Sequence, residues 1–174
     1  MRRLILLRHA KTERAEPGES DRERRLTTRG QADAPVVGTY MARHGLVPDL
    51  ALISPAVRAQ ETWKLVAACF ATTPQAVSEE RVYNAGIGML VALIAATRGP
   101  RSLLLVGHNP GMHDLAVQLI ATGDAHARER VTEKLPTAGL VVIDLAFDDW
   151  ARLRSGGGRL ERFVTPRLIA AATE

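Results

Sequence analysis

Short apolar runs alternate along this chain with segments whose apolar residues recur at helical spacing. The runs have the length of β-strands and are expected at 2–7, 50–53, 76–78, 102–106, 140–146 and 160–164. The run Leu103 to Val106 is apolar on both faces, which is typical of a strand at the centre of a covered sheet. The alternation therefore predicts an α/β fold, a three-layer α/β/α sandwich with a mostly parallel central sheet.

The segments between these runs carry apolar residues at helical spacing. In 63–70 and again in 87–94, apolar residues stand at i, i+3, i+4 and i+7, so each helix has one apolar face for the sheet. Thr27 or Thr28 is expected to cap the first helix. Pro35 would lose a hydrogen bond inside that helix, which predicts a kink there or a start later than Thr28.

The later part of the chain has fewer regular features. Gly123 stands where the carboxyl-terminal cap of a helix belongs. Segment 148–159 contains three consecutive glycines and is interpreted as a flexible connection. With 174 residues and 46% hydrophobic content, the chain is long enough for one sizeable core, so a single domain over 1–174 is expected.

Composition excludes several classes of protein. One cysteine, Cys69, allows no internal disulfide framework, and no metal-ligand spacing occurs, so no metal or other cofactor is predicted. No apolar stretch resembles a signal peptide or reaches the ~20 residues of a membrane span, so we expect a cytoplasmic protein without a membrane partner. The net charge of +4 favours anionic partners, but the basic residues form no nucleic-acid motif, so nucleic acid is not an expected partner.

Basic side chains follow three of the predicted strands. Arg8 and His9 come directly after the first strand, Arg58 comes shortly after the second, and His108 follows the run at 102–106. Because the carboxyl ends of parallel strands meet at one edge of a sheet, these four side chains should share a crevice. A guanidinium group can donate two parallel hydrogen bonds to two oxygens of one phosphate. The sequence therefore predicts a pocket for a phosphoryl dianion.

Two helices are expected to begin beside this crevice, at Ser54–Pro55 and Asn109–Pro110, and their amino ends would add positive charge. No Walker loop is present, so protein cations must offset the phosphoryl charge. Serine, threonine and histidine are then candidate nucleophiles. Ser54 is expected to be engaged as a cap, whereas the cation of Arg8 favours a neutral, nucleophilic imidazole at His9.

Three motifs resemble the histidine phosphatase superfamily, which has the phosphoglycerate-mutase-like fold: LLRHAKTE at 6–13, SPAVRAQET at 54–62 and VGHNPG at 106–111. RRLTTRGQADA at 24–34 and the short chain resemble its SixA-type phosphohistidine phosphatase branch. The resemblance implies that His9 is the nucleophile, that Arg8, Arg58 and His108 bind the phosphoryl group, and that Arg24 reaches the substrate. The alternative for Arg24 is a solvated position in the charged run DRERR.

Larger members of this superfamily carry a glutamate general acid in a lid insert, which has no counterpart here. The stretch SEERVYNAG at 78–86 offers Glu79 and Glu80, and Glu80 is the candidate proton donor or water-positioning group; its alternative is a solvated loop carboxylate. A protonated phosphoimidazole needs less acid assistance than an ester, which favours phosphohistidine on a signalling protein as substrate. Three alternatives remain: a small-molecule phosphomonoesterase acting on a phosphate ester, a mutase, and a catalytically silent phospho-ligand binding module.

Overall fold

The computed structural model describes residues 1–173 of the chain and has one seven-stranded sheet. Its strands are β1 (Arg2–Arg8), β2 (Leu50–Ile53), β3 (Gln75–Ser78), β4 (Ser102–Gly107), β5 (Ile120–Gly123), β6 (Leu140–Leu145) and β7 (Gly158–Val164). Their order is β3-β2-β4-β1-β6-β7-β5. The first four in this order are mutually parallel, β6 is antiparallel to β1 and β7, and β5 is parallel to β7. The predicted mostly parallel sheet is confirmed.

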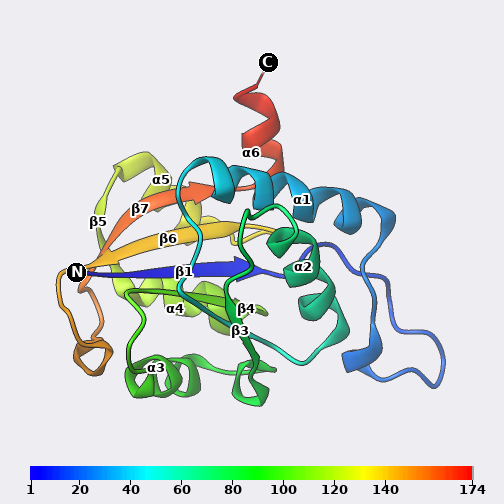
Figure 1. Ribbon diagram of the computed structural model, residues 1–174, viewed down its shortest axis with the longest axis horizontal. Coiled ribbons are helices and arrows are strands. Elements are labelled where there is room, and N and C mark those ends of the chain that lie inside the picture. Colours follow the sequence, from blue (N-terminus) through cyan, green and yellow to red (C-terminus); the bar gives the residue numbers. More distant parts are fainter. Residues whose placement is uncertain (174) are drawn as a thin grey trace.

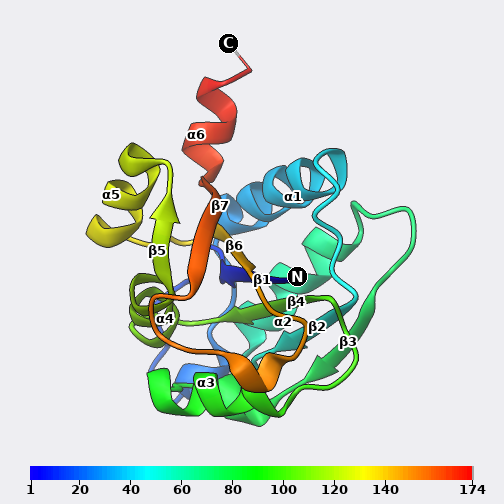
Figure 2. The ribbon, with the colours of Figure 1, turned by 90° about the vertical axis from the view of Figure 1, so that its left-hand side faces the viewer.

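Helices cover both faces of the sheet (Figures 1 and 2). The helices are α1 (Thr28–Arg43), α2 (Val57–Ala67), α3 (Ile87–Ala96), α4 (Gly111–Leu119), α5 (Ala125–Glu133) and α6 (Pro166–Ala171), with short 3₁₀ turns η1 (Asp21–Glu23), η2 (Glu80–Val82) and η3 (Trp150–Arg152). Helices α1 and α2 lie on one face, and α3 and α4 lie on the other (Figure 1). The predicted three-layer α/β/α sandwich is therefore confirmed.

Side chains that point alternately to the two faces of the central strands pack into two hydrophobic cores, one on each face of the sheet. In β1, Leu4 and Leu6 pack in the core beneath α3 and α4, whereas Ile5 and Leu7 pack in the core beneath α1 and α2. All four side chains are fully buried. The run 103–106 in β4 is also fully buried, as its two-sided apolar pattern predicts, because β4 lies between β2 and β1. This packing fixes the ends of β1 and β4, where the predicted site residues follow.

Of three expected helix starts, the cap of the first is confirmed and the other two differ from the structure. Thr27 caps α1 by accepting a hydrogen bond from the amide of Gly30, and α1 begins at Thr28 with Pro35 inside it, so a start later than Thr28 is wrong. The helices expected at Ser54–Pro55 and Asn109–Pro110 begin later, at Val57 and Gly111, and neither Ser54 nor Asn109 caps them. Both side chains make other contacts instead.

Two expectations for the later part of the chain are also wrong. Gly123 does not cap a helix but ends β5 at a φ of 119°. Segment 148–159 is not simply a flexible connection, because it includes η3 and Trp150, whose side chain is 1% exposed. The Trp150 indole N–H donates to the carbonyl of Pro100 at 2.8 Å, so core burial and a hydrogen bond hold this segment in place.

Gly30 allows α1 to pack against the chain that follows β1. A Cβ atom at this position would overlap the backbone carbonyl oxygen of Lys11, which already accepts the amide of Thr27 at 2.9 Å. Because this obstacle is backbone, Gly30→Ala is expected to lower the free energy of unfolding by about 2 kcal/mol or more in urea denaturation. Gly88→Ala is the control, since its Cβ would meet no atom and alanine favours a helix by up to about 1 kcal/mol. Equal effects of the two changes would contradict this account.

Candidate active site

His9 follows the last residue of β1 and is 7% exposed. Its Nδ1 lies 2.8 Å from the carbonyl oxygen of Ala10. A carbonyl only accepts hydrogen bonds, so Nδ1 carries the proton and Nε2 keeps a free lone pair. The amide of Ala10 donates to the Thr62 hydroxyl at 3.0 Å, and that hydroxyl donates to the carbonyl of Arg58 at 2.7 Å. The imidazole is thus oriented, and its loop is tied to α2.

His108 follows β4 and lies beside His9, with the two ring centroids 5.2 Å apart. Its Nε2 lies 2.7 Å from the hydroxyl oxygen of Ser54, which follows β2 and also accepts the amide of Ala56 at 3.3 Å. The buried Nδ1 of His108 has no hydrogen-bond partner among residues 1–173. If the Ser54 hydroxyl donates to Nε2, then Nδ1 carries a proton that an external acceptor can bind.

Arg58 lies in the first turn of α2 and is 4% exposed. Its two terminal nitrogens donate to Asp21, one to the backbone carbonyl at 2.7 Å and one to the carboxylate at 3.0 Å. The hydroxyl of Tyr83 donates to the same carboxylate at 2.6 Å, and Arg24 donates to its other oxygen at 3.0 Å. The hydrogen bond from Tyr83, together with those from Arg24 and Arg58, holds the pKa of Asp21 well below its usual range. An ionised Asp21 therefore orients Arg58.

Arg8 ends β1, and one of its terminal nitrogens donates to the carbonyl of Leu135 at 3.1 Å. Burial lowers the pKa of the Arg8 guanidinium from its ordinary value. The Nε atoms of Arg8 and Arg58 are both buried and unpartnered within residues 1–173. Arg24 also belongs to this cluster, because it donates a hydrogen bond to Asp21, which holds Arg58. Substrate contact by Arg24 stays a prediction.

Glu80 lies at the rim of the cluster rather than in it. Its exposed carboxylate pairs with Arg22, whose guanidinium carbon lies 4.3 Å from the centre of the Tyr83 ring. That ring in turn meets the ring of His108 edge-on, with 5.6 Å between centroids. The hydrogen bond from Arg22 lowers the pKa of Glu80, which favours an ionised carboxylate over a proton donor. A substrate-binding role for Glu80 stays a prediction.

The two buried imidazoles are neutral at physiological pH. Burial is the largest cause that lowers the pKa of His9, to about 3, and the charges of His108, Arg58 and Arg8 lower it further. Burial is also the main cause that lowers the pKa of His108, to about 4, with Arg58 next. The sequence pointed to Arg8 as the reason for a neutral His9, whereas loss of hydration has the larger effect.

These pKa values make folding stability depend on pH. An unfolded histidine takes up a proton near pH 6.5, while folded His9 and His108 remain neutral until about pH 3 and 4. The unfolded state therefore binds more protons, and the free energy of unfolding is expected to fall as pH drops from about 7 to 5. Urea denaturation at both pH values should show this loss. NMR titration should find both rings neutral at pH 5, and a protonated ring there would contradict the assignment.

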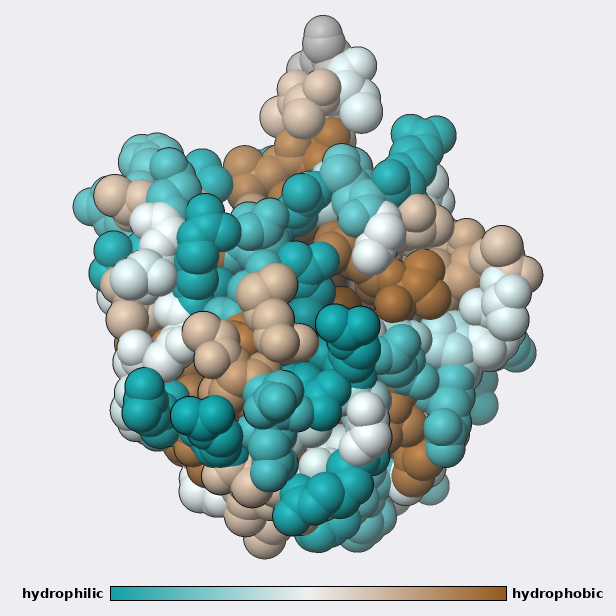
Figure 3. All heavy atoms as spheres, turned by 60° about the vertical axis from the view of Figure 1, so that its left-hand side comes forward, coloured by the Kyte–Doolittle hydropathy of each residue, from teal (hydrophilic) through white to brown (hydrophobic). Residues whose placement is uncertain are grey.

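Among residues 1–173, no three histidine, cysteine, aspartate or glutamate side chains are grouped so as to hold a metal ion. Over the same range, no helix combines the length and apolar character needed to span a bilayer. The face that carries the amino end of β1 is mainly hydrophilic, and apolar side chains gather there at the base of the projecting helix α6 (Figure 3).

Comparisons with known proteins agree with this geometry. A family model described as the histidine phosphatase superfamily (branch 1) matches residues 4–87. The chain is 33% identical to an Agrobacterium tumefaciens protein provisionally assigned as the phosphohistidine phosphatase SixA, covering 95% of this chain and 98% of that one with a TM-score of 0.81. This chain belongs to the histidine phosphatase superfamily. The resemblance to its SixA-type branch is confirmed as well.

Two further relatives match more than nine-tenths of this histidine phosphatase. The uncharacterized protein Rv1276c of Mycobacterium tuberculosis is 34% identical over 164 residues, which cover 92% of this chain and all of the relative. A structure of the protein histidine phosphatase SixA complexed with tungstate shares the fold at 20% identity and a TM-score of 0.72, covering 95% of this chain and 97% of that one. The superfamily is hydrolytic, and this chain is an enzyme of the phosphatase class.

The structure brings together Arg8, His9, Arg58 and His108, as the sequence of this histidine phosphatase predicts. It adds residues that the sequence did not indicate. Asp21 is 37 positions from Arg58 and 62 positions from Tyr83, and no local pattern joins such distant residues. In the charged run DRERR the sequence indicates Arg24 as a candidate, with a solvated loop as the alternative, and the one signal for Asp21 is a carboxylate among arginines.

Proposed function

We propose that this phosphatase acts without a metal ion and through a phosphohistidine formed on His9. The observation that carries the proposal is the hydrogen bond from Nδ1 of His9 to the carbonyl of Ala10, which leaves the Nε2 lone pair free. A pKa of about 3 keeps that lone pair unprotonated at neutral pH. A neutral, oriented imidazole is the state that a nucleophile requires.

Arg8, Arg58 and His108 would hold the phosphoryl oxygens during the transfer. Each contributes a buried nitrogen that has no partner among residues 1–173, and a phosphoryl group supplies acceptors for all three. In the first step, Nε2 of His9 forms a bond to phosphorus as the bond to the leaving group breaks. In the second step, water attacks phosphorus, the bond to Nε2 breaks and returns its electron pair to the ring, and inorganic phosphate is released with the oxygen and both protons of the water. Charge stabilisation and positioning supply most of the catalysis in such transfers.

We propose phosphohistidine on a signalling protein as the substrate. The carboxylate predicted as proton donor, Glu80, is exposed and paired with Arg22 at the rim of the cluster. An ester needs a proton on its leaving oxygen, whereas a protonated phosphoimidazole leaves as a neutral ring. The site is therefore better suited to a phosphoramidate than to an unactivated ester. The SixA assignment of the Agrobacterium protein supports the same substrate class.

A substrate panel tests this proposal. Phosphohistidine on a protein, phosphoserine peptides and sugar phosphates would be compared at equal concentration, with chelator and with vanadate. We expect phosphohistidine to be hydrolysed with the highest kcat/KM, inhibition by vanadate, and no effect of the chelator. Preference for the esters would favour the phosphomonoesterase, transfer to a second acceptor would favour the mutase, and binding without turnover would favour the silent module. Loss of activity with the chelator would contradict a metal-independent mechanism.

A further inference from the structure

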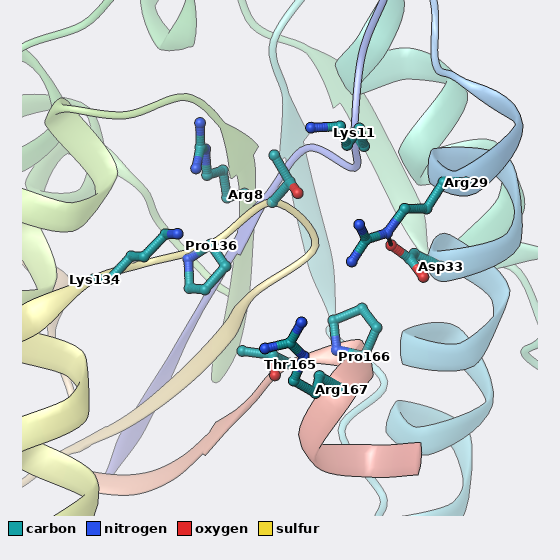
Figure 4. Close-up of a pocket in the computed structure, with 10 residues that line it drawn as sticks. Arg8, Lys11, Arg29, Asp33, Lys134, Pro136, Thr165, Pro166 and Arg167 are labelled. Atoms are coloured by element: carbon teal, nitrogen blue, oxygen red, sulfur yellow. Dashed lines mark ion pairs between the residues drawn. The ribbon is translucent and has the colours of Figure 1, made fainter. Parts of the chain in front are cut away.

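A cationic cavity of about 500 Å³ lies next to the predicted phosphoryl site. It opens between the end of β1, the first turns of α1, the loop before β6 and the junction of β7 with α6 (Figure 4). Its lining residues are Arg8, Lys11, Arg29, Asp33, Lys134, Pro136, Thr137, Thr165, Pro166 and Arg167. These segments come from both halves of the chain, so the cavity exists only in the folded protein.

The charges around this cavity are strongly unbalanced. Five cationic side chains face a single carboxylate, that of Asp33, which lies 3.6 Å from Arg29. The other exposed cations, Lys11, Lys134 and Arg167, form no ion pair with residues 1–173. Figure 4 shows their side chains distributed around the same opening. Like charges held this close repel one another, and an anion bound between them would relieve that repulsion.

The cavity shares one lining residue, Arg8, with the predicted phosphoryl site. Arg8 lines the cavity, and the next residue, His9, has its ring centroid 5.2 Å from that of His108. The loop before β6 is attached to the same strand end, because the amide of Ala138 lies 3.1 Å from the carbonyl oxygens of both Arg8 and His9. Leu135 of this loop accepts hydrogen bonds from Arg8 at 3.1 Å and from Asn109 at 2.9 Å. The cavity and the predicted phosphoryl site therefore meet at the end of β1, beside the guanidinium of Arg8.

We propose that this cavity is a second anion subsite, which binds a carboxylate or phosphate group of the substrate whose phosphoryl group faces His9. The inference rests on the proposed function and narrows its substrates to molecules with a second negative charge close to the scissile phosphoryl group. The group that fills the cavity could belong to acidic side chains beside a phosphohistidine or to the second phosphate of a small molecule. Both offer the oxygen anions that lysine and arginine bind.

The test compares matched substrates with and without the second anion. One pair is a phosphohistidine peptide with flanking aspartates and the same peptide with asparagines. The other pair is fructose 1,6-bisphosphate and fructose 6-phosphate, and p-nitrophenyl phosphate serves as a probe with one anionic group. We expect at least one pair to show about tenfold higher kcat/KM for the doubly anionic member, meaning the substrate that carries a second anionic group besides the scissile phosphoryl group. The pair that shows this difference identifies the source of the second anion.

Charge reversal then locates the effect. The double change Lys134→Glu with Arg167→Glu is expected to raise KM for the preferred doubly anionic substrate about tenfold, to leave kcat unchanged, and to alter kcat/KM for p-nitrophenyl phosphate less than threefold. Lys64→Glu, on the exposed surface of α2, is the control for a charge reversal outside the cavity, and is compared with each of the two single changes as well as with the double change. Lys134→Gln should give a smaller effect in the same direction.

Several results would overturn the inference. If wild-type enzyme hydrolyses p-nitrophenyl phosphate but prefers neither doubly anionic substrate, the subsite is wrong while the proposed phosphatase chemistry stands. The subsite is also wrong if the double variant and Lys64→Glu affect all substrates equally. If the wild-type enzyme hydrolyses none of the substrates, the proposed function and the subsite both fail.

Discussion

Replacing His9 with alanine is expected to lower kcat by about 10⁴-fold or more, because the change removes the atom that forms the bond to phosphorus. No other described side chain offers the same combination of a free ring nitrogen and a fixed tautomer beside two guanidinium groups. Steady-state and single-turnover kinetics on a phosphohistidine substrate would measure the loss. Substrate binding should persist, since Arg8, Arg58 and His108 remain.

Two controls separate loss of the nucleophile from loss of the fold. His126→Ala changes a histidine whose side chain is 77% exposed, and it should leave kcat unchanged. Circular dichroism and thermal unfolding of His9→Ala should show a folded protein, with stability lowered by about 1–3 kcal/mol for the lost packing and hydrogen bond. Turnover within tenfold of wild type in a folded His9→Ala protein would show that another residue is the nucleophile.

Replacing Arg58 with lysine is expected to lower kcat/KM by about 10²- to 10³-fold, although the positive charge is kept. Asp21 holds two nitrogens of the guanidinium, and the third, Nε, is buried without a partner within residues 1–173. A lysine ammonium cannot satisfy Asp21 and also present a donor at the position of Nε. The loss should appear mainly in kcat, because charge in the transition state is spread over the equatorial phosphoryl oxygens, and donors positioned on them stabilise that state.

The matched control is Arg159→Lys, which changes an exposed arginine paired with Glu161 at 2.7 Å and should leave kcat/KM unchanged. In Arg58→Ala, added guanidinium ion should restore part of the activity, a response that a merely structural arginine would not give. Kinetics of Arg58→Lys within fivefold of wild type, together with no rescue of Arg58→Ala, would contradict a phosphoryl-binding role for Arg58.

The convergence of the site was predictable because it follows from strand order and direction. Arg8 ends a strand, and His9 and His108 each follow one, and the apolar runs of these strands are visible in the sequence. Parallel strands place their carboxyl ends together. The two-sided apolar run 103–106 likewise predicts its central position in the sheet. These features depend on local patterns, which a single sequence contains.

Other features depend on contacts between distant residues. Nothing local shows that Asp21 receives hydrogen bonds from Tyr83 and Arg58, or that the Ser54 hydroxyl meets His108 rather than capping α2. The proline after Ser54 suggested a helix start, yet α2 begins at Val57. Side-chain pairing of this kind is decided by tertiary packing, which outweighs local capping preference.

The later strands and helices are harder to predict from the sequence for a similar reason. Helix α5 has only one buried residue, Val131, so it lacks the apolar stripe by which α2 and α3 were recognised. Strand β5 is short and ends at Gly123, and a glycine after an apolar helix resembles a helix terminus. The sequence pattern of apolar residues does not show that β6 is antiparallel to β1, because a strand buried on both faces has the same apolar pattern in either direction.

Mass spectrometry of enzyme mixed with a phosphodonor and quenched in alkali, which preserves phosphohistidine, measures the proposed intermediate itself. We expect one phosphoryl group on the peptide containing His9, present within the first turnover and lost as the substrate is consumed, and none in His9→Ala. Turnover with the phosphoryl group on a serine or on His108, or with no phosphorylated enzyme at any time, would contradict the mechanism.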